Sequence, residues 1–222
     1  MDNVFESEFL KLFDEAIAQF NSTHPAKLSS AQRDKTTVVL GFDESPRRFE
    51  ATLTRNVEHN WMFLYLTDTE NRGHDKKFTI ETLPSYFETS CKSKIHFCIS
   101  SIEGWVAYIP KFHAWWRSAA SAHNQGRINK ASDLREAPNH LGFQLGTYEL
   151  DAFEFEYGDV GTRYFIQLSY NPKKRYICLT LNDTHNPTFW WNFLIDIGAA
   201  LDTNATSAIS ECLETIDGFV SC

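Results

Sequence analysis

The sequence predicts an α+β fold: a mostly antiparallel β-sheet, with two subregions possible, and N-terminal, middle and paired C-terminal helices. Three observations predict this class. Apolar residues recur every three or four positions near both ends of the chain, several short runs alternate with period two, and turn-forming residues between those runs favour antiparallel neighbours. We expect one domain over residues 1–222, with a possible subdivision near residues 125–140.

The N-terminal segment predicts an amphipathic helix from Asn3 to Phe20. Its acidic residues lie away from the apolar stripe, and Asn3 followed by Glu6 resembles a capping box. His24-Pro25 ends the helix, and the polar stretch from Thr23 to Lys35 is expected to be a loop. The stripe consists of Phe5, Phe9, Leu12, Phe13, Ala16 and Phe20.

Strands are predicted in the following part of the chain, where β-branched and aromatic residues alternate with polar ones. Turn-forming residues such as Asp43 to Pro46 and Asn71 to Gly73 separate these runs. The predicted strands cover residues 36–43, 49–54, 61–67 and 77–83.

The middle of the chain is less regular. Tyr86 to Lys94 is ambiguous, whereas Ile95 to Ile102 and Trp105 to Ile109 predict a β-hairpin joined through Glu103-Gly104. A helix is predicted from Phe112 to about Asn124. The polar stretch from Arg127 to Asn139 is interpreted as a mobile connection between two halves.

The clearest succession of elements extends from Tyr148 to Leu201. After a strand at 143–150 and a bulge between Leu150 and Phe153, strands are predicted at 153–157, 163–170 and 176–181. Trp190, Phe193, Leu194, Ile197 and Leu201 then predict a helix, which a second helix beginning near Asn204 joins as an antiparallel pair. This order of elements hints at a duplication, although no residue-level repeat is identified.

Composition restricts the class of partner and the compartment. The formal charge of −8 disfavours nucleic acid and anionic membranes, and clusters such as Lys173 to Arg175 are too short to change this. Five cysteines are an odd number, and the Met-Asp-Asn start carries no basic, apolar leader. We therefore expect reduced thiols and a cytoplasmic protein without a membrane span.

Three groups of residues are of types used in catalysis or metal binding. For each group, an ordinary structural role is favoured over a functional one. Cys91, His96 and Cys98 do not offer enough converging ligands for zinc. Glu154 and Glu156 share one face of a strand and resemble its ordinary solvent side. Asp183-Thr184-His185 is interpreted as the cap of the helix predicted after Pro187. We expect no metal and no cofactor.

The segment from His113 to Arg117 has the most unusual composition. Trp115 and Trp116 point about 100° apart on a helix, so one ring can be exposed beside Arg117. Tryptophan and arginine are enriched at protein–protein hot spots. We therefore predict that His113, Trp115, Trp116 and Arg117 bind a protein partner, although packing of both rings in the core is the alternative.

Two function classes follow. The first is a non-catalytic, acidic protein-binding module, such as a cytosolic inhibitor or a toxin-neutralising immunity protein that meets a basic enzyme. The second is an enzyme or small-molecule-binding protein whose site combines scattered residues such as His113, Arg117, Glu154, Glu156 and His185. A homodimer is a further possibility. The sequence favours the first class, because it contains no recognisable catalytic motif.

Overall fold

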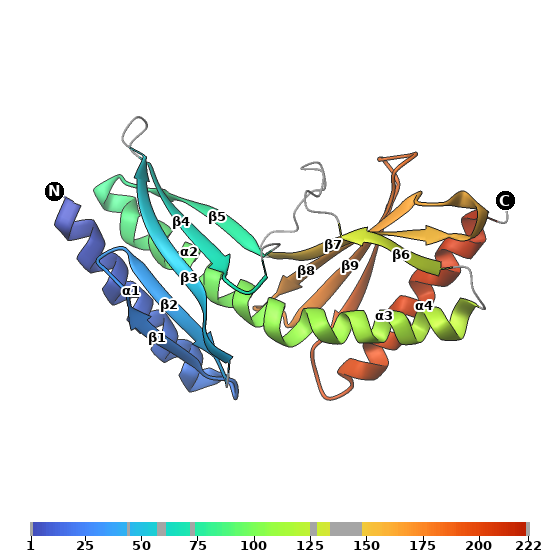
Figure 1. The fold of residues 1–222 in the computed structure, drawn as a ribbon, viewed down its shortest axis with the longest axis horizontal. Helices are drawn as coiled ribbons and strands as arrows, with labels where there is room; N and C mark the ends of the chain where they lie inside the picture. The colour runs from blue at the N-terminus through green and yellow to red at the C-terminus, as the bar shows by residue number, and fades with distance from the viewer. Residues whose placement is uncertain are drawn as a thin grey trace. The chain divides into compact units, whose positions relative to one another are not determined.

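Helices and antiparallel sheets alternate along the chain, which confirms the α+β class (Figure 1). The computed structural model describes residues 2–43, 45–56, 61–71, 74–124, 128–133 and 148–220. The chain divides into two units, Met1–Glu103 and Gly104–Cys222. The segment near 125–140 lies inside the second of these units.

The first unit is a helix, a β-meander and a second helix. All neighbouring strands are antiparallel and lie in the order of the sequence. The two helices pack against each other, and Phe20 of the first helix contacts Phe42 of the sheet, with 6.2 Å between ring centroids. The elements are α1 (Asp2–Thr23), β1 (Leu28–Gln32), β2 (Thr37–Phe42), β3 (Ser45–Asn56), β4 (Trp61–Asp68), β5 (Asp75–Glu81) and α2 (Pro84–Glu103).

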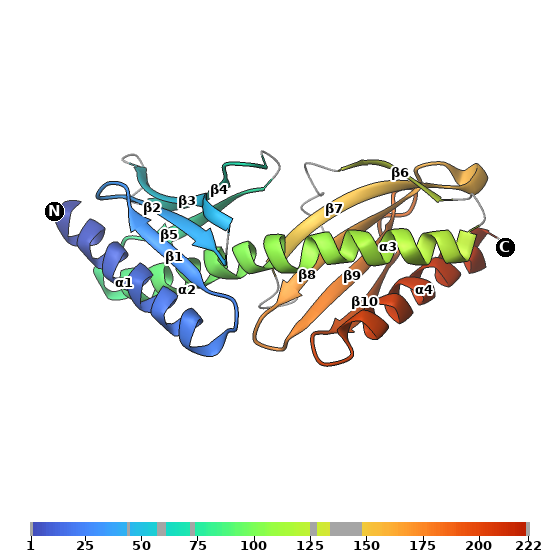
Figure 2. The ribbon, with the colours of Figure 1, turned by 60° about the horizontal axis from the view of Figure 1, so that its bottom comes forward.

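The second unit has the same order of elements. A π-helical turn at Gly104–Tyr108 leads into its first helix, and its five described strands again form an antiparallel meander. Figure 2 shows its two helices side by side. The elements are α3 (Ile109–Asn124), β6 (Ile128–Asp133), β7 (Tyr148–Tyr157), β8 (Tyr164–Asn171), β9 (Tyr176–Asp183), β10 (Trp190–Asp196) and α4 (Leu201–Val220).

Both helices of the second unit cover the same face of its sheet. Phe153, Ile166, Leu181 and Trp191 lie opposite one another on successive strands and therefore share this face. At one end of the row, Trp116 of α3 packs on Phe153, and at the other end α4 packs beside Trp191. The core of this unit therefore lies between the sheet and the helix pair.

The hairpin predicted over residues 95–109 is wrong, because this segment belongs to α2 and the π-helical turn. The buried residues Ile95, Cys98, Ile99 and Ile102 follow helical spacing, and packing on the sheet overrides their preference for strands. Pro110 is the second residue of α3, close after the π-helical turn, where the hydrogen-bond ladder is already irregular and a missing donor costs less.

The helix predicted from Trp190 to Leu201 is also wrong, and only α4 remains of the expected C-terminal pair. Residues 190–196 form β10, in which Phe193 and Ile195 are buried while Trp190 and Leu194 are exposed. Apolar residues therefore occur on both faces of the strand. This hides the alternation that normally identifies a half-buried strand.

Smaller differences concern loops. Residues 28–32 form β1 within a predicted loop, and residues 128–133 form β6 within the stretch interpreted as a mobile connection. The rest of that connection, like residues 143–147 of a predicted strand, lies outside the described residues. A register shift is present in β7, but it lies between Glu149 and Asp151, slightly before the bulge predicted between Leu150 and Phe153.

The second unit repeats the first at the level of residues, a repeat that the predicted order of elements suggested but did not identify. Residues 48–81 align with residues 163–196 without a gap, and paired strands in the two units have corresponding registers. Asp43 and Gly158, at matching positions in the preceding turns, both have positive φ. The identical pairs in this alignment are Arg48/Arg163, Leu53/Leu168, Asn56/Asn171, Leu64/Leu179, Leu66/Leu181, Asp68/Asp183, Thr69/Thr184, Asn71/Asn186, Phe78/Phe193 and Ile80/Ile195.

The last helices of the two units repeat as well. Residues 95–106 align with residues 209–220, and buried positions of α2 fall on buried positions of α4. The chain is therefore a tandem duplication of one helix–meander–helix unit. The identical pairs here are Ile95/Ile209, Cys98/Cys212, Ile102/Ile216, Gly104/Gly218 and Val106/Val220.

Candidate functional site

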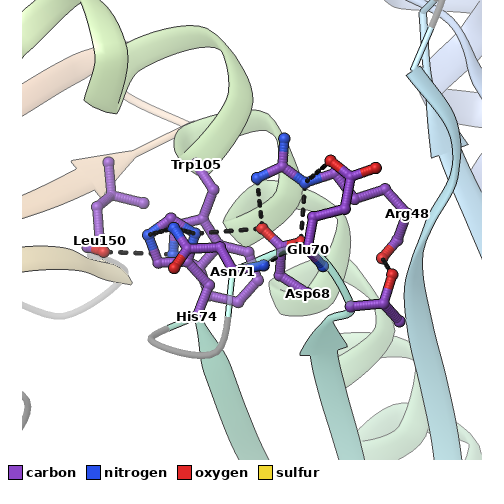
Figure 3. A network of polar contacts seen from close by, with 8 residues as sticks. Arg48, Asp68, Glu70, Asn71, His74, Trp105 and Leu150 are labelled. Carbon is purple, nitrogen blue, oxygen red and sulfur yellow. Dashed lines mark hydrogen bonds and ion pairs between the residues drawn. The ribbon is translucent and has the colours of Figure 1, made fainter.

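The best-connected polar cluster of the first unit surrounds Asp68, the last residue of β4 (Figure 3). Arg48 donates two hydrogen bonds to the carboxylate of Asp68, one of them from Nε at 2.8 Å. The backbone N–H of Glu70 donates to Oδ1 at 3.0 Å, and His74 Nδ1 lies 3.3 Å from Oδ2. Thr69 closes the cluster, because its N–H and hydroxyl both donate to the Arg48 carbonyl.

The second unit repeats this cluster around Asp183, at the end of β9. Arg163 donates to both oxygens of the Asp183 carboxylate at 2.7–3.1 Å, and the His185 N–H donates to Oδ1 at 2.9 Å. The N–H and hydroxyl of Thr184 donate to the Arg163 carbonyl. Asp183 therefore closes the β9–β10 turn. It is not a helix cap as predicted, because a strand and not a helix follows Pro187.

Electrostatics agree with a structural role for both aspartates. Burial alone would raise the pKa of Asp68 and of Asp183, but hydrogen bonds from the arginine and from backbone N–H groups outweigh it and lower each pKa from its ordinary value. Both carboxylates are therefore ionised and fully engaged. A cluster that both copies retain is required by their common fold, so we do not assign it to binding or catalysis.

A histidine–carboxylate pair also occurs in both units, between the ends of their two helices. His123 Nε2 lies 2.7 Å from Asp217 Oδ2, and the hydroxyl of Tyr157 donates to the other oxygen of Asp217. In the first unit, His24 Nε2 lies 3.9 Å from a carboxylate oxygen of Glu103, which aligns with Asp217. The histidine of such a pair resembles a general base, but its presence in both copies again indicates a role in the fold.

The two units differ on their last strands. Positions 74, 75, 76, 77 and 79 of the first unit are His, Asp, Lys, Lys and Thr, whereas the matching positions of the second unit are Phe189, Trp190, Trp191, Asn192 and Leu194. The strand pairing is the same in both units. The common fold therefore does not require apolar residues at positions 189, 190, 191 and 194, and a reason specific to the second unit must be sought for them.

We call Phe189, Trp190, Trp191, Leu194 and Phe219 the aromatic edge. Phe189 stacks on Trp191 with 5.9 Å between ring centroids, and Phe219 of α4 contacts the same tryptophan at 4.6 Å. Trp190 and Leu194 lie on the opposite face of β10, because their positions alternate with that of Trp191. Four of the five side chains are 46–58% exposed. Clustered, exposed apolar side chains of this kind mark interaction sites on soluble proteins.

The C-terminal part of the chain, which includes β10 and α4, is acidic. The sequence contains no Lys or Arg from Tyr176 to Cys222. Asp196, Glu211 and Glu214 are exposed on β10 and α4. The nearest cationic run along the sheet is Lys173 to Arg175, and it lies beside the Asp196 end of β10, where the Ile197 N–H donates to the Arg175 carbonyl. At the Trp190 end, Arg163 is paired with Asp183, so the exposed part of β10 there is apolar.

The sequence-predicted partner site on α3 divides between the core and the surface. Trp116 is only 4% exposed, and its ring packs against Phe112, Phe153 and Phe155 at centroid distances of 5.1–6.1 Å. This side chain belongs to the core, the alternative that the sequence left open.

The neighbours of Trp116 are more accessible. His113 is half-buried and pairs with Asp151 at 2.9 Å, while Arg117 is exposed and donates to the His113 carbonyl. Trp115 Nε1 donates to Asp202 at 3.1 Å and so ties α3 to α4. Binding of a partner by His113, Trp115, Trp116 and Arg117 stays a prediction.

The other sequence candidates do not converge. Cys91 and Cys98 are buried on α2, whereas His96 of the same helix is exposed. Burial raises the pKa of the Cys91 thiol to about 12, so this thiol is a poor nucleophile. Glu154 is half-buried and Glu156 exposed on β7. The described residues contain no group of three or more His, Cys, Asp or Glu side chains that could hold a metal ion.

Comparisons with known proteins give no match from which a function could be inferred. No protein-family model matches the chain, and neither a curated protein nor a solved structure matches it. None of the helices in the described part of the chain has the length and apolarity needed to cross a membrane. The class that fold and site define is a tandemly duplicated α+β protein with an aromatic edge in its second unit.

Proposed function

We propose that this chain is a non-catalytic protein-binding module that contacts its partner through the aromatic edge. The observation that carries the proposal is the difference between the two copies of one fold. β5 presents Asp75, Lys76 and Thr79 where β10 presents Trp190, Trp191 and Leu194. Exposed tryptophan costs solubility, and aromatic residues are enriched where proteins bind each other.

Charge supports a basic partner. The chain carries a formal charge of −8, and this net negative charge attracts a cationic surface and speeds encounter with it. An inhibitor or a toxin-neutralising immunity protein that blocks a basic enzyme fits this chemistry. The enzyme alternative ranks second: the His123–Asp217 pair has a counterpart in His24–Glu103 of the first unit, which favours a role in the fold, and this alternative is left with the His113–Asp151 pair of the second unit.

The test replaces the aromatic edge with the residues of the copy that lacks it. A tagged chain with Trp190→Asp and Leu194→Thr takes the β5 residues at these positions, so we expect its melting temperature to stay close to that of the unchanged chain. Both proteins are used to capture partners from the native lysate at low and high salt. We expect one stoichiometric, salt-sensitive partner that the variant loses. A variant that retains every captured protein would refute the proposed surface.

A control variant addresses the sequence-predicted site on α3. Arg117→Ala removes an exposed side chain without disturbing the core around Trp116. If Arg117→Ala, rather than the β10 variant, releases the partner, the binding surface lies on α3 and the aromatic edge has another role.

A further inference from the structure

We infer that the aromatic edge recognises an extended segment of its partner, apolar in the middle and basic at its ends, which adds to the sheet as a strand beside β10. This inference rests on the proposed function and specifies its partner. In the described part of the chain, β10 pairs with β9 alone and is an end strand of its sheet. Alternate N–H and C=O groups of such a strand point away from the sheet and are available for another strand.

β5, the matching edge of the first unit, is protected against strand addition. It carries Lys76 and Lys77, and the ammonium of Lys77 lies 3.9 Å from the centre of the Phe63 ring. Lysines on an edge strand are a common means of preventing unwanted pairing. β10 has Trp191 and Asn192 at the same two positions, and its only charged residue is Asp196 at the far end. The second unit has therefore lost the protection that the first unit keeps.

Apolar side chains on both faces of β10 offer contacts to the side chains of an added strand. Trp190 and Leu194 project on one face, while Trp191 lies on the other beside Phe219 of α4. Successive side chains of an added strand point to alternate faces of the sheet. Side chains of the added strand on either face could therefore meet apolar side chains of β10 or α4, which is the way strand-addition sites obtain specificity beyond main-chain hydrogen bonds.

Charge decides between a second copy of this chain and a different, basic partner. Each copy carries a formal charge of −8 and has no Lys or Arg from Tyr176 to Cys222, so two copies joined along β10 would repel each other. A basic segment is instead attracted by this net negative charge. The structure therefore favours a basic segment from another protein.

The test uses synthetic peptides and the full chain. The probe is a peptide of five alternating Val and Leu residues with two Lys at each end, titrated by fluorescence anisotropy. We expect saturable binding, and at least about ten-fold weaker binding when Glu replaces Lys, because complementary charge is lost. Two further peptides are N-methylated, one on its odd-numbered and the other on its even-numbered residues, so each lacks the N–H donors along one edge of the strand. Only the peptide that lacks the donors facing β10 should fail to bind.

A matched pair of variants locates the peptide on the chain. Asn192→Lys introduces the residue that β5 carries at this position, and we expect it to weaken peptide binding at least about ten-fold. Ser118→Lys adds the same charge to an exposed position of α3 and should leave binding unchanged.

Several outcomes would overturn the inference. If both N-methylated peptides bind, or neither does, pairing along a single edge of the peptide is excluded. If the Lys-flanked peptide does not bind at all, an apolar segment with basic ends is excluded as the ligand. A homodimer that Asn192→Lys dissociates would show that a second copy occupies β10. These results leave the proposed function standing, because that fails only if the Trp190→Asp, Leu194→Thr variant retains its captured partners.

Discussion

Removal of the Asp68 carboxylate should destabilise the first unit by about 3 kcal/mol. Its side chain is fully buried, and that of its partner Arg48 is 20% exposed. Removing one member of a buried pair costs about 3–5 kcal/mol, because the remaining charge loses its partner. Glu70, 3.6 Å from Arg48 Nε, can compensate in part, so Asp68→Ala belongs at the lower end of this range.

Urea denaturation measures this loss, and hydrogen exchange of peptides from β4 and β5 assigns it to the first unit. Asp75→Ala removes an exposed carboxylate of β5 and should change stability by less than about 0.5 kcal/mol. Replacing both partners, with Arg48→Met and Asp68→Leu, should cost less than Asp68→Ala alone, because no buried charge remains unpaired. A loss below about 1 kcal/mol for Asp68→Ala would refute the view that this ion pair maintains the turn.

Two further predictions use the correspondence between the copies. Gly104→Ala should destabilise the second unit by about 1–3 kcal/mol, because the new Cβ overlaps the buried Leu150 side chain. At the matching position, the new Cβ of Gly218→Ala meets no atom within 4 Å, so this change should be neutral or stabilising by up to about 1 kcal/mol. Thermal unfolding of both variants measures these differences. Equal effects of the two would contradict the close packing at Gly104. The pKa values of Asp68 and Asp183 are lowered in the folded state, so their stabilisation is present above the ordinary value of 3.8 and is lost as pH falls through the lower, folded pKa. Unfolding free energy measured across this acidic range should therefore decrease more steeply for the unchanged chain than for Asp68→Ala.

The sequence predicted elements well where apolar residues keep to one face. The N-terminal helix is an example: the stripe that includes Phe9, Leu12 and Phe13 is buried as expected. Prediction failed where function or packing disturbs the pattern. Trp190 and Leu194 are exposed although apolar, so β10 resembled a helical stripe, and the same two residues belong to the proposed binding surface.

The candidate site was not predictable from a single pass along the chain. The signal that locates it is the contrast between β5 and β10, and this contrast becomes visible only after the repeat is aligned. The repeat itself is faint in the sequence, because identities such as Leu53/Leu168 and Leu64/Leu179 are separated by several substituted positions. Trp116 illustrates the opposite difficulty, since the sequence alone leaves open which tryptophan of α3 lies in the core.

The meander topology has a consequence for how this chain folds. Every strand pairs with its neighbour in sequence, so most contacts in each sheet are local and can form quickly. Two adjacent copies with the same register also present hairpins that are partly interchangeable, and tandem domains of this kind are prone to misassembly by exchange of equivalent segments. The divergence between Lys76-Lys77 and Trp191-Asn192 makes the last hairpins of the two units unlike each other. The difference that we assign to recognition therefore also disfavours exchange of the last hairpin between the two copies during folding.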